Sequence, residues 1–370
     1  MQDFKVFLDS VRVKALKKGV SSATLERAFK GLKPNPKIIE YDRNQAEFTL
    51  NFWRYINSRV SNNRLKKGRI KFKENQALLN RVYKKYGIPP SILVAFWGLE
   101  TNYGRHVGKM NLVRSLATLS FDKRRREFFT SELLILLKLI DDDKLPLTVE
   151  GSWAGAMGNL QFMPSNVAMY AIDWDKDGKL DLWGSKEDIF HTGSNFLKHI
   201  GWRRGERWGD EVKIAKDFEF SLASLKIKKS VQEWQDLGVI RADGTAFSNP
   251  LQKASLVLPM GYQGPAFLVY RNFRTILRWN RSILYALSVG HLADRLSSKP
   301  TLIAKSVTEP SLSRDDIQTI QMKLNNLGFD TGKPDGIPGP KTRGATRNYQ
   351  RANNLPIDGY VGYQLLKGLQ

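Results

Sequence analysis

The stretch PPSILVAFWGLETNYG, residues 89–104, decides how the rest of the chain is understood. Apolar residues occupy nearly every side of the helix that it predicts, which is typical of a helix buried inside a protein. Ser91 follows two prolines at its start, Gly104 marks its stop, and Glu100 falls about one turn before its end. An apolar surround raises the pKa of a carboxyl group, so Glu100 is a candidate proton donor near neutral pH. The alternative is a structural glutamate bonded to backbone across a helix junction.

Composition limits the partners of the chain. The 370 residues are enough for two domains, and they include 59 Lys and Arg against 36 Asp and Glu. The formal net charge of +23 predicts a polyanionic partner or an anionic surface, for which nucleic acid, acidic lipid and bacterial cell wall all qualify. The absence of cysteine excludes disulfides and thiolate chemistry. The longest aliphatic run, residues 133–140, is too short to span a bilayer, and no export signal is visible.

Helical periodicity dominates the chain around the opening stretch. Apolar residues recur at helical spacing in residues 4–32, 44–60, 74–86 and 123–140. The four histidines show no metal-ligand spacing and are expected to be ordinary surface or core residues. These segments therefore predict a mainly helical region.

A glycine-rich segment, GSWAGAMGNLQFMPSN, covers residues 151–166. Its four glycines predict a loop whose backbone is shaped for close approach to a ligand. Polar Ser152, Asn159 and Gln161 are mixed with apolar residues such as Phe162. This mixture suits a sugar, which offers hydroxyls at its rim and apolar faces on its rings. The alternative is a tightly packed turn without a ligand.

An acidic segment, DWDKDGKLD, follows the glycine-rich loop. Oxygen ligands at alternate positions, with Gly178 sixth, match the start of a calcium loop. The candidate ligands are Asp173, Asp175, Asp177, the Lys179 carbonyl and Asp181. The twelfth position is Gly184 where the motif wants a bidentate Glu, so Glu187 or Asp188 would have to close a longer loop. The alternative is an acidic turn that caps the helix after it.

The pattern changes between about residues 211 and 260, where short alternating runs, turns and scattered prolines predict a small sheet inserted into a helical domain. Helical periodicity returns at residues 265–296 and leaves Asn280 and Tyr285 as polar candidates for a cleft. Residues 297–309 have the composition of a linker.

A separate small unit is expected at residues 312–370. Ser313 can cap a helix whose apolar residues recur at helical spacing: Ile317, Ile320, Leu324 and Leu327. Asp-Gly recurs at Asp335 and Asp358, each as a turn that leads into a helix. This half-repeat predicts three short helices around a miniature core.

The segments GLETNYG and GSWAGAMGNLQFMPS and the acidic loop, followed by YRNFRTILRWN, together resemble the membrane-bound lytic murein transglycosylase B family. These are lysozyme-like enzymes of bacterial cell-wall turnover. The tail, with DGIPGPKTRGATRNYQ and LPIDG, looks like the three-helix peptidoglycan-binding domain often attached to them. The resemblance implies a mainly α protein: a lysozyme-like α+β catalytic domain with a small inserted sheet at residues 1–296, a linker at 297–311 and a peptidoglycan-binding domain at 312–370.

The resemblance makes Glu100 the sole catalytic acid and base of a lytic transglycosylase. Such an enzyme cleaves the β-1,4 bond between N-acetylmuramic acid and N-acetylglucosamine and leaves a 1,6-anhydro end without consuming water. The substrate-binding residues that it implies, with Tyr103 added from its place beside the glutamate, are Tyr103, Ser152, Gln161, Phe162, Asn280 and Tyr285. A hydrolytic muramidase of the same fold and a non-catalytic wall-binding scaffold are the alternatives.

The acidic loop matches the family's metal-binding loop, in which the longer closure falls on Glu187. The expected ligands are therefore Asp173, Asp175, Asp177, Lys179, Asp181 and Glu187, holding a structural Ca²⁺ or Na⁺, with no cofactor for catalysis. The expected partners are peptidoglycan glycan strands and other cell-wall enzymes, but not nucleic acid, because no nucleic-acid-binding motif accompanies the charge. We expect a monomer. We also expect it to lie in the periplasm, soluble or peripheral at the cell wall, since no cysteine is present to accept a lipid.

Overall fold

The computed structural model describes residues 2–43 and 51–369. Contacts divide the chain into two compact units, residues 1–45 with 66–200 and residues 46–65 with 201–370. No helix in the described ranges is both long enough and apolar enough to cross a lipid bilayer. The first part of the helix predicted at 44–60, up to residue 50, lies outside the described residues.

The regular elements in the described part of the first unit are helices and one short antiparallel strand pair, joined by loops. Its elements are α1 (Gln2–Lys17), α2 (Ser22–Phe29), α3 (Pro36–Arg43), α6 (Gln76–Tyr86), α7 (Pro90–Thr101), β1 (Met110–Asn111), α8 (Leu112–Phe121), α9 (Arg126–Asp141), β2 (Glu150–Gly151), α10 (Pro164–Tyr170) and α11 (Lys186–His199). Helix α5 (Asn62–Glu74) begins in the second unit and ends in the first.

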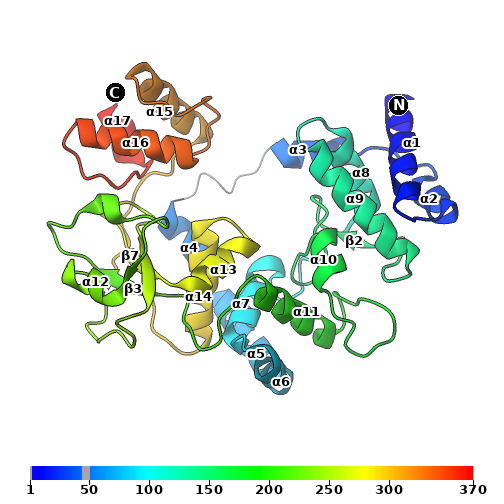
Figure 1. Ribbon diagram of the computed structural model, residues 1–370, viewed down its shortest axis with the longest axis horizontal. Coiled ribbons are helices and arrows are strands. Elements are labelled where there is room, and N and C mark those ends of the chain that lie inside the picture. The colour runs from blue at the N-terminus through cyan, green and yellow to red at the C-terminus, as the bar shows by residue number, and fades with distance from the viewer. Residues whose placement is uncertain (1, 44–50, 370) are drawn as a thin grey trace. The chain divides into compact units, whose positions relative to one another are not determined.

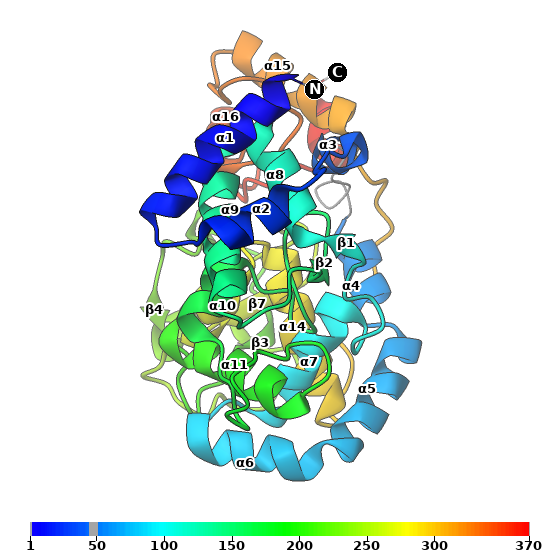
Figure 2. The same ribbon diagram turned by 90° about the vertical axis from the view of Figure 1, so that its right-hand side faces the viewer.

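The core of the first unit forms where α8 and α9 pack together, with α1, α2 and α3 against them (Figures 1 and 2). Leu133, Leu136 and Leu137 of α9 are fully buried. The ring of Phe4 on α1 meets Phe121 of α8 edge-on, with centroids 5.2 Å apart. Each buried leucine contributes about 1.5–3 kcal/mol to stability, so these helices form a firm support for the loops that follow.

The second unit combines an antiparallel sheet with helices. Its described elements are α4 (Phe52–Arg59), β3 (Gly209–Lys213), the 3₁₀ turn η2 (Phe220–Leu222), β4 (Lys229–Ser230), α12 (Val231–Asp236), β5 (Ile240–Arg241), β6 (Lys253–Val257), β7 (Ala266–Val269), α13 (Arg271–Trp279), α14 (Ile283–Leu296), α15 (Arg314–Asn326), α16 (Pro340–Ala352) and α17 (Tyr363–Gly368).

The five strands of the sheet lie in the order β4-β6-β7-β3-β5. Leu256 of β6 pairs with Leu268 of β7, and the fully buried Trp234 of α12 packs in the same core while its indole N–H donates to the Ala254 carbonyl at 3.1 Å. The inserted sheet is thus confirmed. Its strand β7 was predicted as the start of a helix, and that prediction was wrong. Its four apolar residues are all buried, and so short a run carries no periodicity that separates strand from helix.

Three short helices, α15, α16 and α17, form the small C-terminal core that the sequence predicted. Ser313 caps α15 in a reciprocal capping box with Asp316. Ile317 and Leu324 are buried, as expected, but Leu327 is 57% exposed. The helix ends at Asn326, so the helical spacing that placed Leu327 in the core no longer applies there.

A buried glutamine holds each of the two Asp-Gly turns in this C-terminal region. The Gln321 side-chain oxygen accepts the N–H of Gly336 at 2.8 Å, and the Gln350 oxygen accepts the N–H of Gly359, also at 2.8 Å. Both glycines have positive φ, +72° and +68°, which a residue with a Cβ adopts only with strain. Each half of the repeat therefore contains a buried glutamine as well as the Asp-Gly turn that this glutamine holds.

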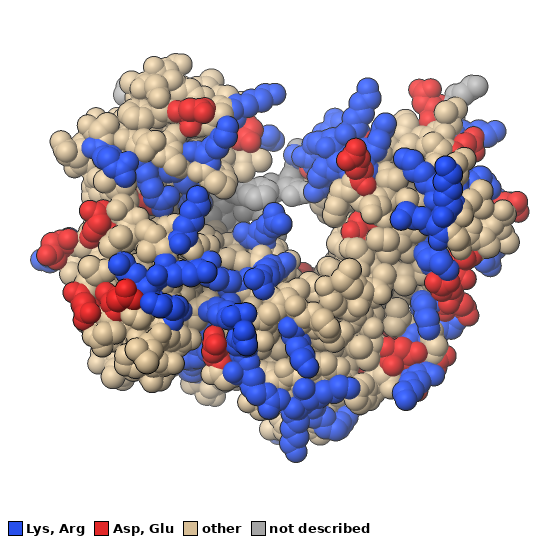
Figure 3. Space-filling view, viewed as in Figure 1, with Lys and Arg blue, Asp and Glu red and all other residues tan. Residues whose placement is uncertain are grey.

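Basic side chains gather over α5 and α6 in Figure 3. Nine Lys and Arg lie between residues 64 and 85, with Glu74 as the only acidic residue among them. This surface accounts for part of the net charge of +23 and favours contact with an anionic polymer.

Candidate active site and acidic loop

Helix α7 presents Glu100 at its C-terminal turn. Pro90 at the first turn fits the fixed φ of proline, and the helix is buried from Ser91 to Leu99. Glu100 itself is half-buried and is the acidic residue of this apolar helix. The chain leaves the helix through Asn102 and Tyr103, whose φ angles of +51° and +63° are uncommon for residues other than glycine.

Tyr103 packs back onto the helix that carries Glu100. Its ring meets Trp97 edge-on with centroids 5.7 Å apart, and the residue is 8% exposed. A Cβ added to Gly98 would come within 2.7 Å of the Tyr103 ring. The close approach of ring and glycine therefore fixes the turn directly after the glutamate.

Asn159 joins α7 to the glycine-rich loop and to the acidic loop. Its side-chain oxygen accepts the indole N–H of Trp97 at 2.6 Å, and its amide N–H groups donate to the carbonyls of Leu182 at 3.1 Å and Trp183 at 2.8 Å. Its own carbonyl accepts the Thr101 hydroxyl at 2.8 Å. Asn159 is 2% exposed, so this residue, which the sequence suggested only as one of the polar residues of a sugar-binding loop, is a positioning residue.

Two predicted binding residues shape the backbone of the glycine-rich loop. The Ser152 hydroxyl accepts the N–H of Ala156 at 3.0 Å and so closes a tight turn. Gln161 has a positive φ of 54°, and its amide donates to the carbonyls of Val107 at 3.2 Å and Gly158 at 2.9 Å. These hydrogen bonds within the protein therefore fix the conformation of the loop without a ligand.

The other predicted binding residues have different surroundings. Phe162 is 3% exposed, and its ring packs edge-on against Phe196 with centroids 5.4 Å apart. Asn280 and Tyr285 belong to the second unit, where the Asn280 side chain accepts the N–H of Ser282 at 3.0 Å and Tyr285 is 7% exposed on α14. The contact of these three residues with a substrate stays a prediction.

The acidic loop gathers three carboxylates. Ligand atoms of Asp173, Asp175 and Asp188 lie within 4.8 Å of one another. One oxygen of Asp173 accepts the N–H of Gly178 at 2.9 Å, and the other is buried without a hydrogen-bond partner. Burial raises the pKa of Asp188, and the nearby Asp175 and Asp173 add to the effect, although two backbone N–H groups oppose it. Clustered hard oxygen donors of this kind fit a cation such as Ca²⁺.

Asp188, rather than the predicted Glu187, closes this cluster. The Glu187 carboxylate instead pairs with Arg81 at 2.6 Å. Asp188 is 2% exposed and accepts the N–H groups of Trp174 at 2.9 Å and Asp181 at 3.1 Å, which holds both ends of the loop. The two acids are adjacent on α11 and point in different directions, which sequence spacing alone did not resolve.

Asp177 and Asp181 do not belong to the cluster of three carboxylates, and the Lys179 carbonyl stays a predicted ligand. The Asp181 carboxylate accepts the backbone N–H groups of Trp183, Gly184 and Ser185 and so caps the turn. Asp177 accepts the N–H of Lys179 at 2.7 Å, a local bond within the loop. Their role as metal ligands stays a prediction.

Comparison with known proteins agrees with this geometry. Residues 3–294 match the transglycosylase SLT domain family, and residues 313–369 match the peptidoglycan binding domain family. The membrane-bound lytic murein transglycosylase B of Escherichia coli strain K12 is 34% identical over 252 residues, which are 66% of this chain and 67% of that protein.

Solved structures extend the comparison to the whole chain. SltB3 of Pseudomonas aeruginosa, in complex with NAG-anhNAM-pentapeptide, is 41% identical with a TM-score of 0.95 and covers 100% of both chains. The Escherichia coli lytic transglycosylase Slt35 in complex with calcium is 30% identical with a TM-score of 0.66 and covers 80% of this chain and 93% of its own. The predicted lysozyme-like fold is confirmed. The chain therefore belongs to the lytic murein transglycosylases of the transglycosylase SLT domain family and carries a peptidoglycan-binding domain at residues 313–369.

Proposed function

We propose that Glu100 is the acid and then the base of a lytic transglycosylase reaction on peptidoglycan glycan strands. The observation that carries this assignment is that Glu100 is the only acidic residue of α7 and lies half-buried at the end of an otherwise buried helix. The first step needs a carboxyl group that donates a proton, and a glutamate at this position supplies one.

In the first step, the Glu100 carboxyl donates its proton to the oxygen between N-acetylmuramic acid and N-acetylglucosamine. The bond from this oxygen to the anomeric carbon breaks, and N-acetylglucosamine leaves with a free 4-hydroxyl. The acetamido group of the substrate stabilises the positive anomeric carbon, so the second carboxylate of most glycoside hydrolases is not needed.

In the second step, the ionised Glu100 accepts the proton of the muramic acid 6-hydroxyl. The oxygen of that hydroxyl attacks the anomeric carbon of the same sugar and closes a 1,6-anhydro ring. The nucleophile is tethered to its target, which gives it a high effective concentration without a bound water.

The walls of the first unit support this chemistry by their rigidity. Tyr103 and Asn159 hold the turn after Glu100, while Ser152 and Gln161 hold the glycine-rich loop. Both Gln161 bonds use its amide nitrogen, so its side-chain oxygen is the group that we assign to a substrate N–H or O–H. Phe162, Asn280 and Tyr285 are proposed to complete the substrate contacts.

We also propose that the acidic loop holds a structural Ca²⁺ through Asp173, Asp175 and Asp188. The ion would neutralise three clustered carboxylates and hold the loop against α11, without taking part in bond cleavage. The proposed location is the cell envelope, in the periplasm, where the glycan strands lie. Association with other cell-wall enzymes and a monomeric state stay predictions.

The substitution Glu100→Gln tests the assignment. The amide keeps the shape of the side chain but cannot donate the proton, so we expect the rate to fall by about 100-fold or more while binding to murein sacculi remains. Glu127→Gln, an exposed glutamate of the same unit, is the matched control and should keep full activity. Retention of more than a few per cent of the rate by Glu100→Gln would remove Glu100 from the mechanism.

A further inference from the structure

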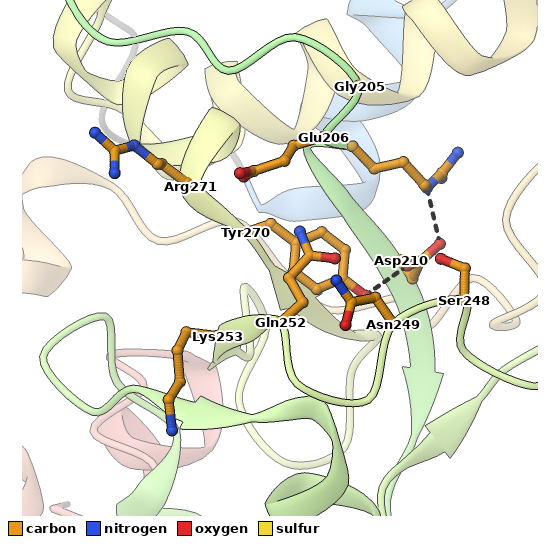
Figure 4. A pocket seen from close by; sticks show the side chains of 10 residues that line it. Gly205, Glu206, Asp210, Ser248, Asn249, Gln252, Lys253, Tyr270 and Arg271 are labelled. Atoms are coloured by element: carbon orange, nitrogen blue, oxygen red, sulfur yellow. Dashed lines mark hydrogen bonds and ion pairs between the residues drawn. The ribbon is translucent and has the colours of Figure 1, made fainter.

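A pocket lies in the second unit, built by residues that the proposed reaction does not use. It has a volume of about 370 Å³ and lies between the chain before β3, the loop before β6 and the start of α13 (Figure 4). Glu206 and Arg271 lie along one side of the pocket in Figure 4, Lys253 lies on the other side, and Gln252 lies between them.

The floor of this pocket is closed by a buried acid. One oxygen of Asp210 accepts the Tyr270 hydroxyl at 2.7 Å, and the other pairs with Arg207 at 3.1 Å and Arg241 at 3.2 Å. Asp210 is 6% exposed. Its charge is fully engaged by these partners, so the floor is a fixed polar surface and not itself a group that awaits a ligand.

The walls are held equally firmly. The fully buried Asn272 accepts the N–H of Arg203 at 2.7 Å and donates to the carbonyls of Arg203 and Glu206, both at 2.8 Å. On the facing side, Asn249 closes a turn through the N–H of Leu251 at 3.1 Å. A site whose walls are fixed beforehand loses little conformational entropy when it binds.

Three groups at the pocket have no partner among residues 2–43 and 51–369. The Arg271 guanidinium and the Glu206 carboxylate form no ion pair, and the Gln252 side-chain nitrogen is buried without an acceptor. Lys253, by contrast, pairs with Glu233 at 3.1 Å. A buried donor without an acceptor carries a desolvation cost, which a ligand carbonyl or carboxylate oxygen would remove.

The chemistry of these groups selects the ligand. A cation, an anion and an amide donor around one pocket match a molecule that carries a carboxylate, an amino group and a carbonyl. A saccharide fits less well, because Tyr270 is the only aromatic residue that lines the pocket and it is 3% exposed, so no ring face is offered for stacking on a sugar.

We propose that this pocket binds the zwitterionic peptide stem of peptidoglycan, with Arg271 on a stem carboxylate, Glu206 on a free amino group and Gln252 on a carbonyl oxygen. The identity of the stem as the source of this peptide rests on the proposed function, since glycan strands carry such stems. In this proposal the pocket binds the peptide stem, and Glu100 cleaves the glycan strand.

The test is calorimetric titration of the full chain with the tripeptide L-Ala-γ-D-Glu-meso-diaminopimelate. We expect saturable binding that Arg271→Gln and Glu206→Gln each weaken about tenfold, because each removes one charge-assisted contact. The matched controls are Lys216→Gln and Asp217→Asn, which remove one charge of each sign from exposed positions of the same unit outside the pocket and should bind as the parent does.

A second arm assigns the amino contact. Acetylation of the free side-chain amine of the tripeptide should weaken its binding to the parent protein about tenfold but leave its binding to Glu206→Gln unchanged. Absence of saturable binding, equal binding by all variants, or displacement of the tripeptide by chitotriose would overturn the proposal. Binding of the tripeptide is measured without turnover. Inactivity of the protein on murein would therefore contradict the proposed function without changing what the binding result means.

Discussion

At the scale of single residues, the site depends on a contact between a glycine and a ring. Gly98 lies one turn of α7 before Thr101, and the Tyr103 ring covers the place where a Cβ would be. Tyr103 and Asn102 both have left-handed backbones, which for residues other than glycine cost about 1 kcal/mol or more each. The packing of Tyr103 on Gly98 and Trp97 offsets that cost and keeps the chain turned just after Glu100.

We predict that Gly98→Ala lowers both stability and activity. The new methyl group would lie about 2.7 Å from the Tyr103 ring, so the ring must move and the turn after Glu100 must shift with it. The expected loss of stability is about 1–3 kcal/mol, measured by chemical denaturation, with a parallel fall in the rate of murein release.

Gly344→Ala is the control for this prediction. Gly344 lies in α16 with no atom within 4 Å of the added Cβ, so alanine should leave stability unchanged or raise it by a few tenths of a kcal/mol up to about 1 kcal/mol. If Gly98→Ala behaved like Gly344→Ala, the contact between Gly98 and Tyr103 would not be what fixes the turn.

The sequence offers Glu100 as a candidate because one acid in an apolar helix is a visible exception to the pattern. The sequence did not identify Asn159 as a positioning residue. A polar residue in a glycine-rich loop can face a ligand or hydrogen-bond to the backbone, and the sequence does not distinguish the two. The space available for a Cβ at Gly98 also depends on the ring of Tyr103, five residues along the chain, and no sequence periodicity indicates this contact.

At the scale of elements, the acidic loop is connected to α11 by one carboxylate. Asp188 lies in the first turn of α11 and accepts backbone N–H groups from Trp174 and Asp181. The Trp174 ring also stacks on His191 of the same helix, with centroids 3.4 Å apart and planes within 8°. Burial lowers the pKa of His191 to about 4, with Lys85 and Arg81 adding to the effect, so this imidazole is neutral at pH 7.

We predict that Ca²⁺ raises the melting temperature of the protein but not its catalytic rate. Without a cation the three carboxylates of the loop repel one another, and binding to the folded state alone stabilises that state by mass action. The measurement is thermal unfolding in excess chelator against millimolar Ca²⁺, with an expected shift of a few degrees.

Asp173→Asn should lose this response to Ca²⁺, whereas Asp217→Asn, an exposed acid of the second unit, should keep it. An equal melting temperature with chelator and with Ca²⁺ would show that the cluster does not hold an ion that matters for folding.

Elements with caps were the most predictable part of the fold. Ser313 caps the helix that follows it, as its side chain suggested. The strand β7 was missed because its four apolar residues are buried on both faces of the sheet and do not alternate. Asp188 lies in the cluster of three carboxylates and Glu187 pairs with Arg81, because one step along a helix turns a side chain by about 100°.

At the scale of the whole molecule, the C-terminal helices pack against the sheet region of their own unit. The Asp358 carboxylate accepts the N–H of Tyr262 at 2.9 Å, and Arg347 donates to the carbonyl of Ala223 at 3.1 Å. Glu309, before the first of these helices, accepts the hydroxyl of Tyr360 at 2.7 Å. The segment expected to be a linker therefore makes specific contacts, although the domain boundaries at 296 and 311 stay predictions.

We predict that removal of residues 312–370 weakens binding to whole murein sacculi but spares turnover of short soluble glycans. The C-terminal region matches a peptidoglycan-binding family, so its loss removes a second attachment to the polymer without touching α7. Co-sedimentation with sacculi measures the first effect, and circular dichroism checks that the remaining chain is folded. Undiminished sedimentation of the truncated protein would assign the C-terminal helices another role.

At this scale the sequence predicted which kinds of region the chain contains, but not the contacts that join the C-terminal helices to the sheet region. Charge and motif order predicted an enzyme of an anionic polymer with a second, smaller helical region. The bonds from Asp358 and Arg347 to residues about 100 positions away could not be predicted, because polar pairs distant in sequence leave no periodic signal.

The central claim is that the substrate's own 6-hydroxyl, and not water, attacks the anomeric carbon after Glu100 has donated its proton. Mass spectrometry of the muropeptides released from purified murein tests this claim most directly. The account predicts ends of 1,6-anhydro-N-acetylmuramic acid, about 18 mass units lighter than the hydrolysed sugar through the loss of one water and resistant to borohydride reduction. Products with mainly reducible ends would show that water is the acceptor and that the protein acts as a muramidase.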